Sequence, residues 1–174
     1  MKMINSILDI DEIDKNIIEI IQKEPTLTHT EIAKKINRSQ PTIGMRIRKL
    51  ESNGVLKFQA GIDLRNLDLI IARVDLQTLE PDKILELVRN CPYMLNALRL
   101  SGASNISIFM ASTKLNHIDN IVNHHFRRNP DVLNVHLDII TDAVQDFVLP
   151  FSFNFDKCTM QSSGECCGLC NCKK

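Results

Sequence analysis

Residues 28–54 constrain the fold more than any other stretch, because they read as two short helices joined by a tight turn. Thr28 followed by Glu31 predicts a capping box, in which each side chain bonds the backbone amide of the other residue. Asn37-Arg38 predicts the turn, and Ser39 predicts the N-cap of the second helix. Two helices joined in this way are typical of a helix-turn-helix.

A third helix precedes this pair. Residues 10–23 carry isoleucines at helical spacing with charged residues between them, and Pro25 ends the helix. In the helix-turn-helix, Gly54 suits the left-handed position after the last helix. The side chains expected to face inward there are Ile32, Ala33, Ile36, Ile43, Ile47 and Leu50. The pattern predicts a domain of three helices.

The outer side of the last helix is the candidate reading surface. Polar side chains near the start of such a helix reach base edges in the major groove, and basic side chains neutralise phosphates. We therefore predict that the DNA-binding residues are Ser39, Gln40, Thr42, Met45, Arg46, Arg48 and Lys49.

Local charge supports this hypothesis although the total charge does not. The whole chain balances 21 basic against 21 acidic residues, but residues 29–57 hold seven basic residues and two acidic ones. A DNA backbone responds to such a local patch and not to the sum over the chain. The alternative is a three-helix packing unit whose charges are merely solvated.

These residues resemble the N-terminal domain of the Lrp/AsnC (feast/famine) transcription regulators. The matching segments are Asp11–Ile21, Glu31–Ala33, Ser39, Arg46-Ile47, Lys49–Glu51 and Gly54–Leu56. The resemblance implies a regulator that binds double-stranded DNA. Val55 and Leu56 are then expected to lead into a strand that ends near Asp63.

The second part of the chain alternates strands and helices in the order strand-helix-strand-strand-helix-strand. The expected strands are residues 69–76, 93–100, 106–111 and 132–140, and the expected helices are residues 81–91 and 114–128. This order is typical of the ferredoxin-like βαββαβ fold, with both helices on one face of the sheet. The bare face needs a cover, so we expect a homodimer. The resemblance extends here to the family's RAM-type dimerisation and effector domain, and tetramers or octamers are also open.

The turn Gly102-Ala103-Ser104-Asn105 occupies the place where the family carries a Gly-x-x-Asp-like effector turn. The resemblance therefore implies effector-binding roles for Gly102, Ser104 and Asn105. Asn105 stands where Asp is usual and lacks the charge that favours a ligand's ammonium group. A purely structural turn is the alternative.

The final residues carry a cluster of cysteines in the pattern Cys-x7-Cys-Cys-x2-Cys-x-Cys. We predict metal or redox chemistry for these thiols, which are Cys158, Cys166, Cys167, Cys170 and Cys172. An iron–sulfur cluster is favoured, zinc or another soft metal ion comes second, and a reversible disulfide switch is third. A tail without chemical function is the fourth interpretation.

Three histidines and one more cysteine also carry chemistry. His117 and His124 lie two turns apart, a poor spacing for a metal pair, so they and His125 are interpreted as surface or interface residues. Cys91 is expected to be buried or to end a helix.

Together these observations predict an α+β chain with residues 1–62 as the DNA-binding domain, 63–155 as the ferredoxin-like domain and 156–174 as the tail. It is expected to be cytoplasmic, because no apolar run spans a membrane and the first residues turn acidic too soon for a secretory signal. Siroheme decarboxylases share the architecture, but residues 93–110 lack an aromatic-His-Arg cluster. We therefore predict a redox- or metal-responsive regulator and not an enzyme. An amino-acid-responsive regulator with an inert tail also stays open at this point, as does a metal-buffering or interaction protein that keeps the helix-turn-helix only as a scaffold.

Overall fold

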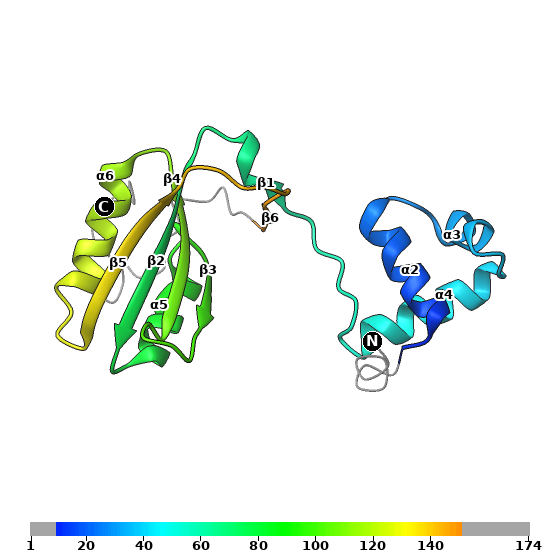
Figure 1. The fold of residues 1–174 in the computed structure, drawn as a ribbon, viewed down its shortest axis with the longest axis horizontal. Helices are drawn as coiled ribbons and strands as arrows, with labels where there is room; N and C mark the ends of the chain where they lie inside the picture. The colour runs from blue at the N-terminus through cyan, green and yellow to red at the C-terminus, as the bar shows by residue number, and fades with distance from the viewer. Residues whose placement is uncertain (1–9, 151–174) are drawn as a thin grey trace. The chain divides into compact units, whose positions relative to one another are not determined.

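The structure is a computed structural model that describes residues 10–150. The chain forms two compact units that divide between Gln59 and Ala60 (Figure 1). The predicted third segment, residues 156–174, lies outside the described residues. No helix among the described residues combines the length and apolar character that crossing a bilayer requires.

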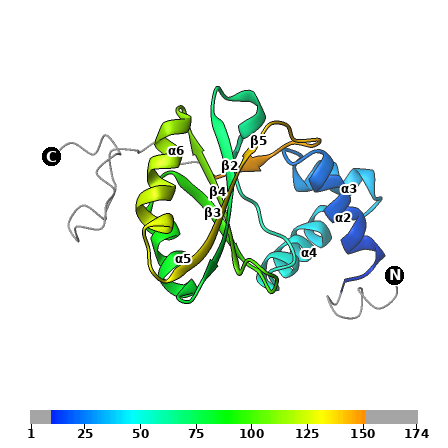
Figure 2. The same cartoon turned by 60° about the vertical axis from the view of Figure 1, so that its left-hand side comes forward.

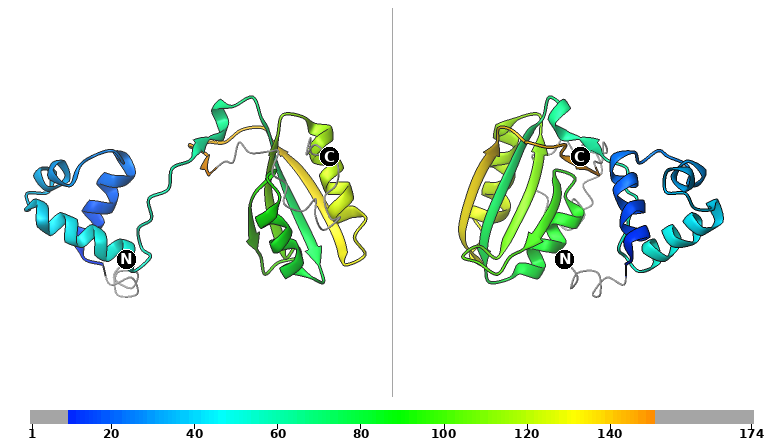
Figure 3. Two further views of the ribbon diagram at one scale, coloured as in Figure 1. Left: turned by 180° about the vertical axis from the view of Figure 1, so that it is seen from behind. Right: turned by 45° about the vertical axis from the view of Figure 1, so that its right-hand side comes forward.

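Unit 1 contains the three predicted helices, α2 (Glu12–Lys23), α3 (His29–Lys35) and α4 (Gln40–Ser52) (Figure 3). The capping box of Thr28 and Glu31 is confirmed, and Ser39 caps α4 as predicted. One apolar core joins the three helices, and its buried members are Ile17, Ile21, Ile32, Ala33, Ile43, Ile47 and Leu50.

Both helices of the helix-turn-helix end in the same hydrogen-bonding motif. After α3, Arg38 N donates to Ala33 O (2.9 Å) and Asn37 N donates to Lys34 O (3.3 Å). After α4, the amides of Val55 and Gly54 make the equivalent bonds. This is the Schellman motif, and it needs a left-handed residue just past the helix. Asn37 (φ 52°) and Gly54 (φ 69°) adopt that conformation.

The strand expected after Gly54 is much shorter than predicted. Only Ile62–Asp63 forms a strand, β1, and it pairs with β6 (Val148–Leu149). Val55 and Leu56 pack on the helical core instead, and residues 57–61 have no neighbouring strand to pair with among the described residues. A run of apolar residues becomes a strand only where a partner supplies the hydrogen bonds.

Unit 2 has the predicted ferredoxin-like order. Its strands and helices are β2 (Ile70–Thr78), α5 (Pro81–Asn90), β3 (Met94–Arg99), β4 (Ile106–Ser112), α6 (Leu115–Val122) and β5 (Val132–Ile140). The antiparallel sheet runs β3-β4-β2-β5, and α5 and α6 cover the same face (Figure 2). Val74, Ile108 and Phe126 are fully buried between sheet and helices.

The second helix of unit 2 was predicted as one regular helix, but the structure divides it into two parts. The α-helix ends at Val122 and continues as a π-helical turn, η2 (Asn123–Arg127). His125 lies on this turn, and burial together with neighbouring His124 lowers its pKa to about 4. His117 is half-buried, bonds Ser112 Oγ through Nδ1 (3.0 Å) and packs edge-on against Tyr93. His117 and His125 are therefore less exposed than a surface interpretation implies.

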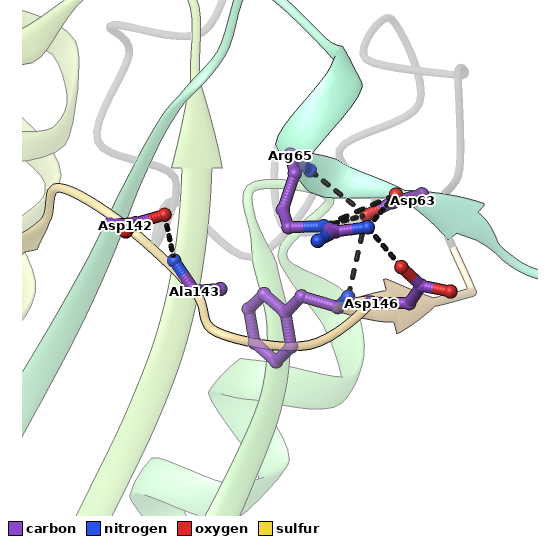
Figure 4. A network of polar contacts seen from close by, with 6 residues as sticks. Asp63, Arg65, Asp142, Ala143 and Asp146 are labelled. Carbon is purple, nitrogen blue, oxygen red and sulfur yellow. Dashed lines mark hydrogen bonds and ion pairs between the residues drawn. The ribbon is translucent and has the colours of Figure 1, made fainter.

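A polar cluster fastens residues 146–149 to the start of unit 2 (Figure 4). Arg65, in the short helix η1 (Leu64–Asn66), binds Asp63 through Nη2 (3.0 Å) and also pairs with Asp146. The hydrogen bond from Arg65 is the main cause that lowers the pKa of Asp63. Beside it, a Cβ on Gly61 would lie 2.7 Å from Val148 Cγ1, so glycine permits the close approach of β1 and β6.

The turn between β3 and β4 is tied to the end of β2 by the side chain of Asn105. Its Oδ1 accepts from Thr78 N (3.0 Å) and its Nδ2 donates to Thr78 O (2.7 Å). The amide group thus continues the backbone pairing of the sheet. An aspartate at this position has no donor for the Thr78 carbonyl.

The left-handed turn predicts a residue-specific stability effect. Asn37→Ala should lower the free energy of unfolding of unit 1 by about 1 kcal/mol, because a Cβ-bearing residue without a local polar partner is strained there. Asn37→Gly should stay within about 0.5 kcal/mol of the parent protein. Urea denaturation followed by circular dichroism measures both. Asn53→Ala is the matched control, since Asn53 has an ordinary φ of −84°; equal losses at the two asparagines would contradict the prediction.

The Asn105 bridge predicts a pH-dependent substitution. Asn105→Asp should lower the unfolding free energy by about 1–3 kcal/mol at pH 7, because a carboxylate then faces the Thr78 carbonyl. Protonation restores a donor, so the folded state raises the pKa of this carboxyl, and the deficit should shrink as pH falls towards about 4. Asn105→Ala should show a deficit that does not depend on pH. Parallel pH profiles for the two variants would refute the bridging role.

Candidate nucleic-acid interface

Helix α4 divides cleanly into a buried side and an exposed side. Ile43, Gly44, Ile47 and Leu50 are buried against unit 1. Four of the predicted contact residues on α4 are exposed, and these are Gln40, Met45, Arg48 and Lys49. A recognition helix contacts base edges with residues near its N-terminus, and Gln40 and Met45 lie in the first half of α4.

Ser39 and Thr42 are engaged with each other at the start of α4. Ser39 Oγ accepts a hydrogen bond from Thr42 N (3.4 Å) and lies 2.7 Å from Thr42 Oγ1. Their hydroxyl groups therefore help to begin the helix. A base contact by either hydroxyl group would therefore compete with the hydrogen bonds that cap α4.

Arg46 lies at the interior edge of the unit and binds two carboxylates of α2 and its cap. Its Nη1 donates to Asp11 Oδ2 and to Asp14 Oδ1, both at 2.8 Å. The Arg46 side chain is 24% exposed and that of Asp14 only 6%. The hydrogen bond to Asp14, followed by the one to Asp11, raises the pKa of Arg46. Its Nε is buried and has no hydrogen-bond partner among the described residues.

This ion cluster was not anticipated from the sequence. Asp11 and Asp14 also form a capping box with each other, since each side chain accepts from the backbone amide of the other. The backbone hydrogen bond from Asp14 is the main cause that lowers the pKa of Asp11. The Asp-x-x-Asp spacing at the start of the first helix is a signal for the capping box, but it does not identify Arg46 as a partner. The structure assigns Arg46 to holding α4 on α2.

Further basic groups lie on and after α3. Lys34, Lys35 and Arg38 are exposed. Lys35 pairs with Glu24, and Arg38 Nη1 donates to Asn37 O (3.0 Å). Together with Arg48 and Lys49, these are exposed basic groups of the helix-turn-helix, and such groups attract phosphates.

The predicted effector residues line neither of the two hollows described below. Gly102 is exposed and Ser104 is partly exposed, while the Asn105 amide is committed to Thr78. Two hollows of unit 2 lie elsewhere. One of about 140 Å³ adjoins Arg65, Ile71 and Phe147, and one of about 480 Å³ adjoins Leu87 and His125.

The predicted metal ligands all belong to the C-terminal segment of the chain. Cys158, Cys166, Cys167, Cys170 and Cys172 lie outside the described residues. Within residues 10–150, no group of three or more His, Cys, Asp and Glu side chains is arranged to hold a metal ion. Cys91 is buried in the core of unit 2, as expected.

Comparison with known proteins covers both units. Residues 10–57 match a family model described as winged helix-turn-helix DNA-binding. The chain is 26% identical over 120 residues to LrpC of Bacillus subtilis, an HTH-type transcriptional regulator, covering 67% of this chain and 83% of LrpC. It is 24% identical over 139 residues to PH0061 of Pyrococcus horikoshii, an uncharacterised HTH-type transcriptional regulator, covering 77% of this chain and 94% of that protein.

Solved structures show the same fold. The crystal structure of PH0061 superposes with a TM-score of 0.68 at 22% identity, covering 80% of this chain and 97% of that one. Escherichia coli AsnC gives a TM-score of 0.66 at 16% identity, covering 79% and 96%. The LrpC match is longer than either unit alone, so it extends beyond the helix-turn-helix. These relatives are named as transcriptional regulators, and the chain is similar to them over both units.

Proposed function

We propose that this protein is a cytoplasmic, sequence-specific DNA-binding regulator that places α4 in the major groove. The observation that carries the proposal is the two-sided character of α4. Its inner side is fixed by the core and by Arg46, its outer side exposes Met45, Arg48 and Lys49, and Gln40 is exposed in its first turn. A rigid helix with such an outer side satisfies the geometric requirement for reading base edges.

The basic residues divide into two roles. Arg48 and Lys49 are exposed on α4, and Lys34 and Arg38 are exposed near it in the sequence. These groups supply affinity for the phosphate backbone without sequence information. Arg46 is neutralised by Asp11 and Asp14 and acts as a positioning residue.

The protein acts as a homodimer through the open face of its sheet. Arg73 on this face binds Asp138 (2.9 Å) and Asp75 (3.3 Å), and Asp75 accepts from Ser107 Oγ (2.6 Å). The charges are thus partly balanced within one chain, which reduces the cost of covering them. Leu98, half-exposed on β3, adds apolar surface to the same face. A second copy pairs two recognition helices for two half-sites, and tetramers or octamers extend the same arrangement.

The cysteine-rich tail makes DNA binding responsive to redox state or metal. Four cysteines between residues 166 and 172, with Cys158 upstream, exceed what a simple dithiol switch requires. Thiolates in short segments are the ligands that iron–sulfur clusters need, so this cofactor is favoured over zinc or another soft ion. Metal or cluster loss would then change the affinity for DNA.

Two arginines of α4 give the sharpest test of the interface. Arg48→Ala should weaken binding to all duplexes alike and reduce the slope of log K against log salt by about 1, with thermal stability unchanged. Arg46→Ala should instead lower the unfolding free energy by about 2–3 kcal/mol, because Asp14 loses its partner. Fluorescence anisotropy at several salt concentrations and thermal melts measure both. A stable Arg46→Ala variant with the salt slope of Arg48→Ala would show that Arg46 contacts phosphate.

The tail is tested in the full chain under anaerobic conditions. Protein purified without oxygen should contain iron and acid-labile sulfide and absorb broadly near about 400 nm. Its affinity for a promoter fragment should change on oxidation. The matched control replaces the five tail cysteines by Ser and keeps Cys91; it should lack the cofactor and ignore oxidation. Protein that contains zinc but no sulfide would show that the tail binds zinc and not an iron–sulfur cluster. If the control still responded to oxidation, the tail would be excluded as the sensor.

A further inference from the structure

The outer side of α4 carries an apolar group where a solvated helix has polar ones. Met45 is 65% exposed, although Ile43 and Ile47 on either side of it are buried. Pro41, one turn earlier on the same side, is exposed as well. Together they form an apolar patch in the N-terminal half of the helix, and Arg48 and Lys49 follow it one turn later. Bases are read by the N-terminal half of a recognition helix, so the patch lies at the reading end.

The direction of Met45 is fixed by its two chain neighbours. Gly44 packs against α3, since a Cβ there would lie 3.3 Å from His29 Nδ1. Arg46 is bound to Asp11 and Asp14 on the α2 side. At 3.6 residues per turn, the side chain between two such anchored positions points nearly opposite to the buried stripe. Met45 therefore projects from unit 1 away from both α2 and α3.

The chemistry of the major groove limits what such a side chain can recognise. Base pairs present hydrogen-bond donors and acceptors there, apart from the C5-methyl group of thymine. The thioether side chain of Met offers only a weak hydrogen-bond acceptor. A base donor or acceptor that it covers therefore loses its hydrogen bond to water and gains no equivalent one. A methyl group covered by it loses only unfavourable contact with water.

We propose that Met45, with Pro41 beside it, reads a thymine methyl group, so that each half-site carries a T·A pair opposite this patch. The inference rests on the proposed function and adds the chemical identity of one recognised group. Met45 is then a specificity-determining residue, whereas Arg48 contributes affinity alone. Burial of one methyl group corresponds to about a fourfold change in the dissociation constant.

The test uses the full-length protein and removes the methyl group alone. Duplexes that the protein selects from a randomised pool are resynthesised with each thymine replaced in turn by deoxyuridine. At one position per half-site, this change should weaken binding by the parent protein about fourfold. Met45→Ala should bind the thymine duplex more weakly and lose the difference between thymine and deoxyuridine there, as a double-mutant cycle requires for a direct contact.

Arg48→Ala is the matched control from the same exposed side. It should bind both duplexes more weakly by one factor and keep the preference for thymine. A parent protein indifferent to every deoxyuridine, or a Met45→Ala variant that keeps the full preference, would overturn the methyl-reading role while DNA binding stands. If the parent protein selects no sequence at all, sequence-specific binding fails and this inference fails with it. Thermal melts confirm that the variants remain folded.

Discussion

Unit 1 depends on one partly buried ion cluster, in which the Arg46 guanidinium joins Asp11 and Asp14. The apolar core can hold three short helices together, but hydrophobic contacts are not directional and leave the rotation of a helix loosely specified. A charged group with two fixed partners specifies that rotation, since an unpaired Asp14 carboxylate would be costly. The orientation of every outward side chain on α4 follows from this constraint.

The same division between a specifying polar contact and an apolar core recurs in unit 2. Val74, Ile108 and Phe126 supply the burial that stabilises the sheet against its helices. The amide of Asn105 then fixes the β3–β4 turn against Thr78 by replacing a missing pair of backbone bonds. In this chain Asn105, which was expected to face a ligand, uses its side-chain amide to complete the sheet.

Patterns that depend on neighbours in the sequence predicted most of the fold. The caps at Thr28 and Ser39, the left-handed Gly54 and the βαββαβ order all follow from local rules, and the structure contains them. Contacts between distant residues were not predictable in this way. The pairing of Arg46 with Asp11 and Asp14 joins residues more than thirty positions apart. Both aspartates precede the basic stretch at residues 29–57, so the charge of that stretch does not reveal them. The pairing of β1 with β6 was missed for the same reason. A strand ending near Asp63 was expected, but Val148–Leu149 was not predicted as its partner.

That small pairing has a mechanical consequence. The segment that precedes β1 follows unit 1 in the sequence, and the segment that follows β6 precedes the five clustered cysteines. Ile62 lies opposite Leu149, and Arg65 bridges Asp63 and Asp146, so both segments leave the sheet domain from one clamped point. Tension applied to either segment is therefore borne by the same few hydrogen bonds as tension on the other.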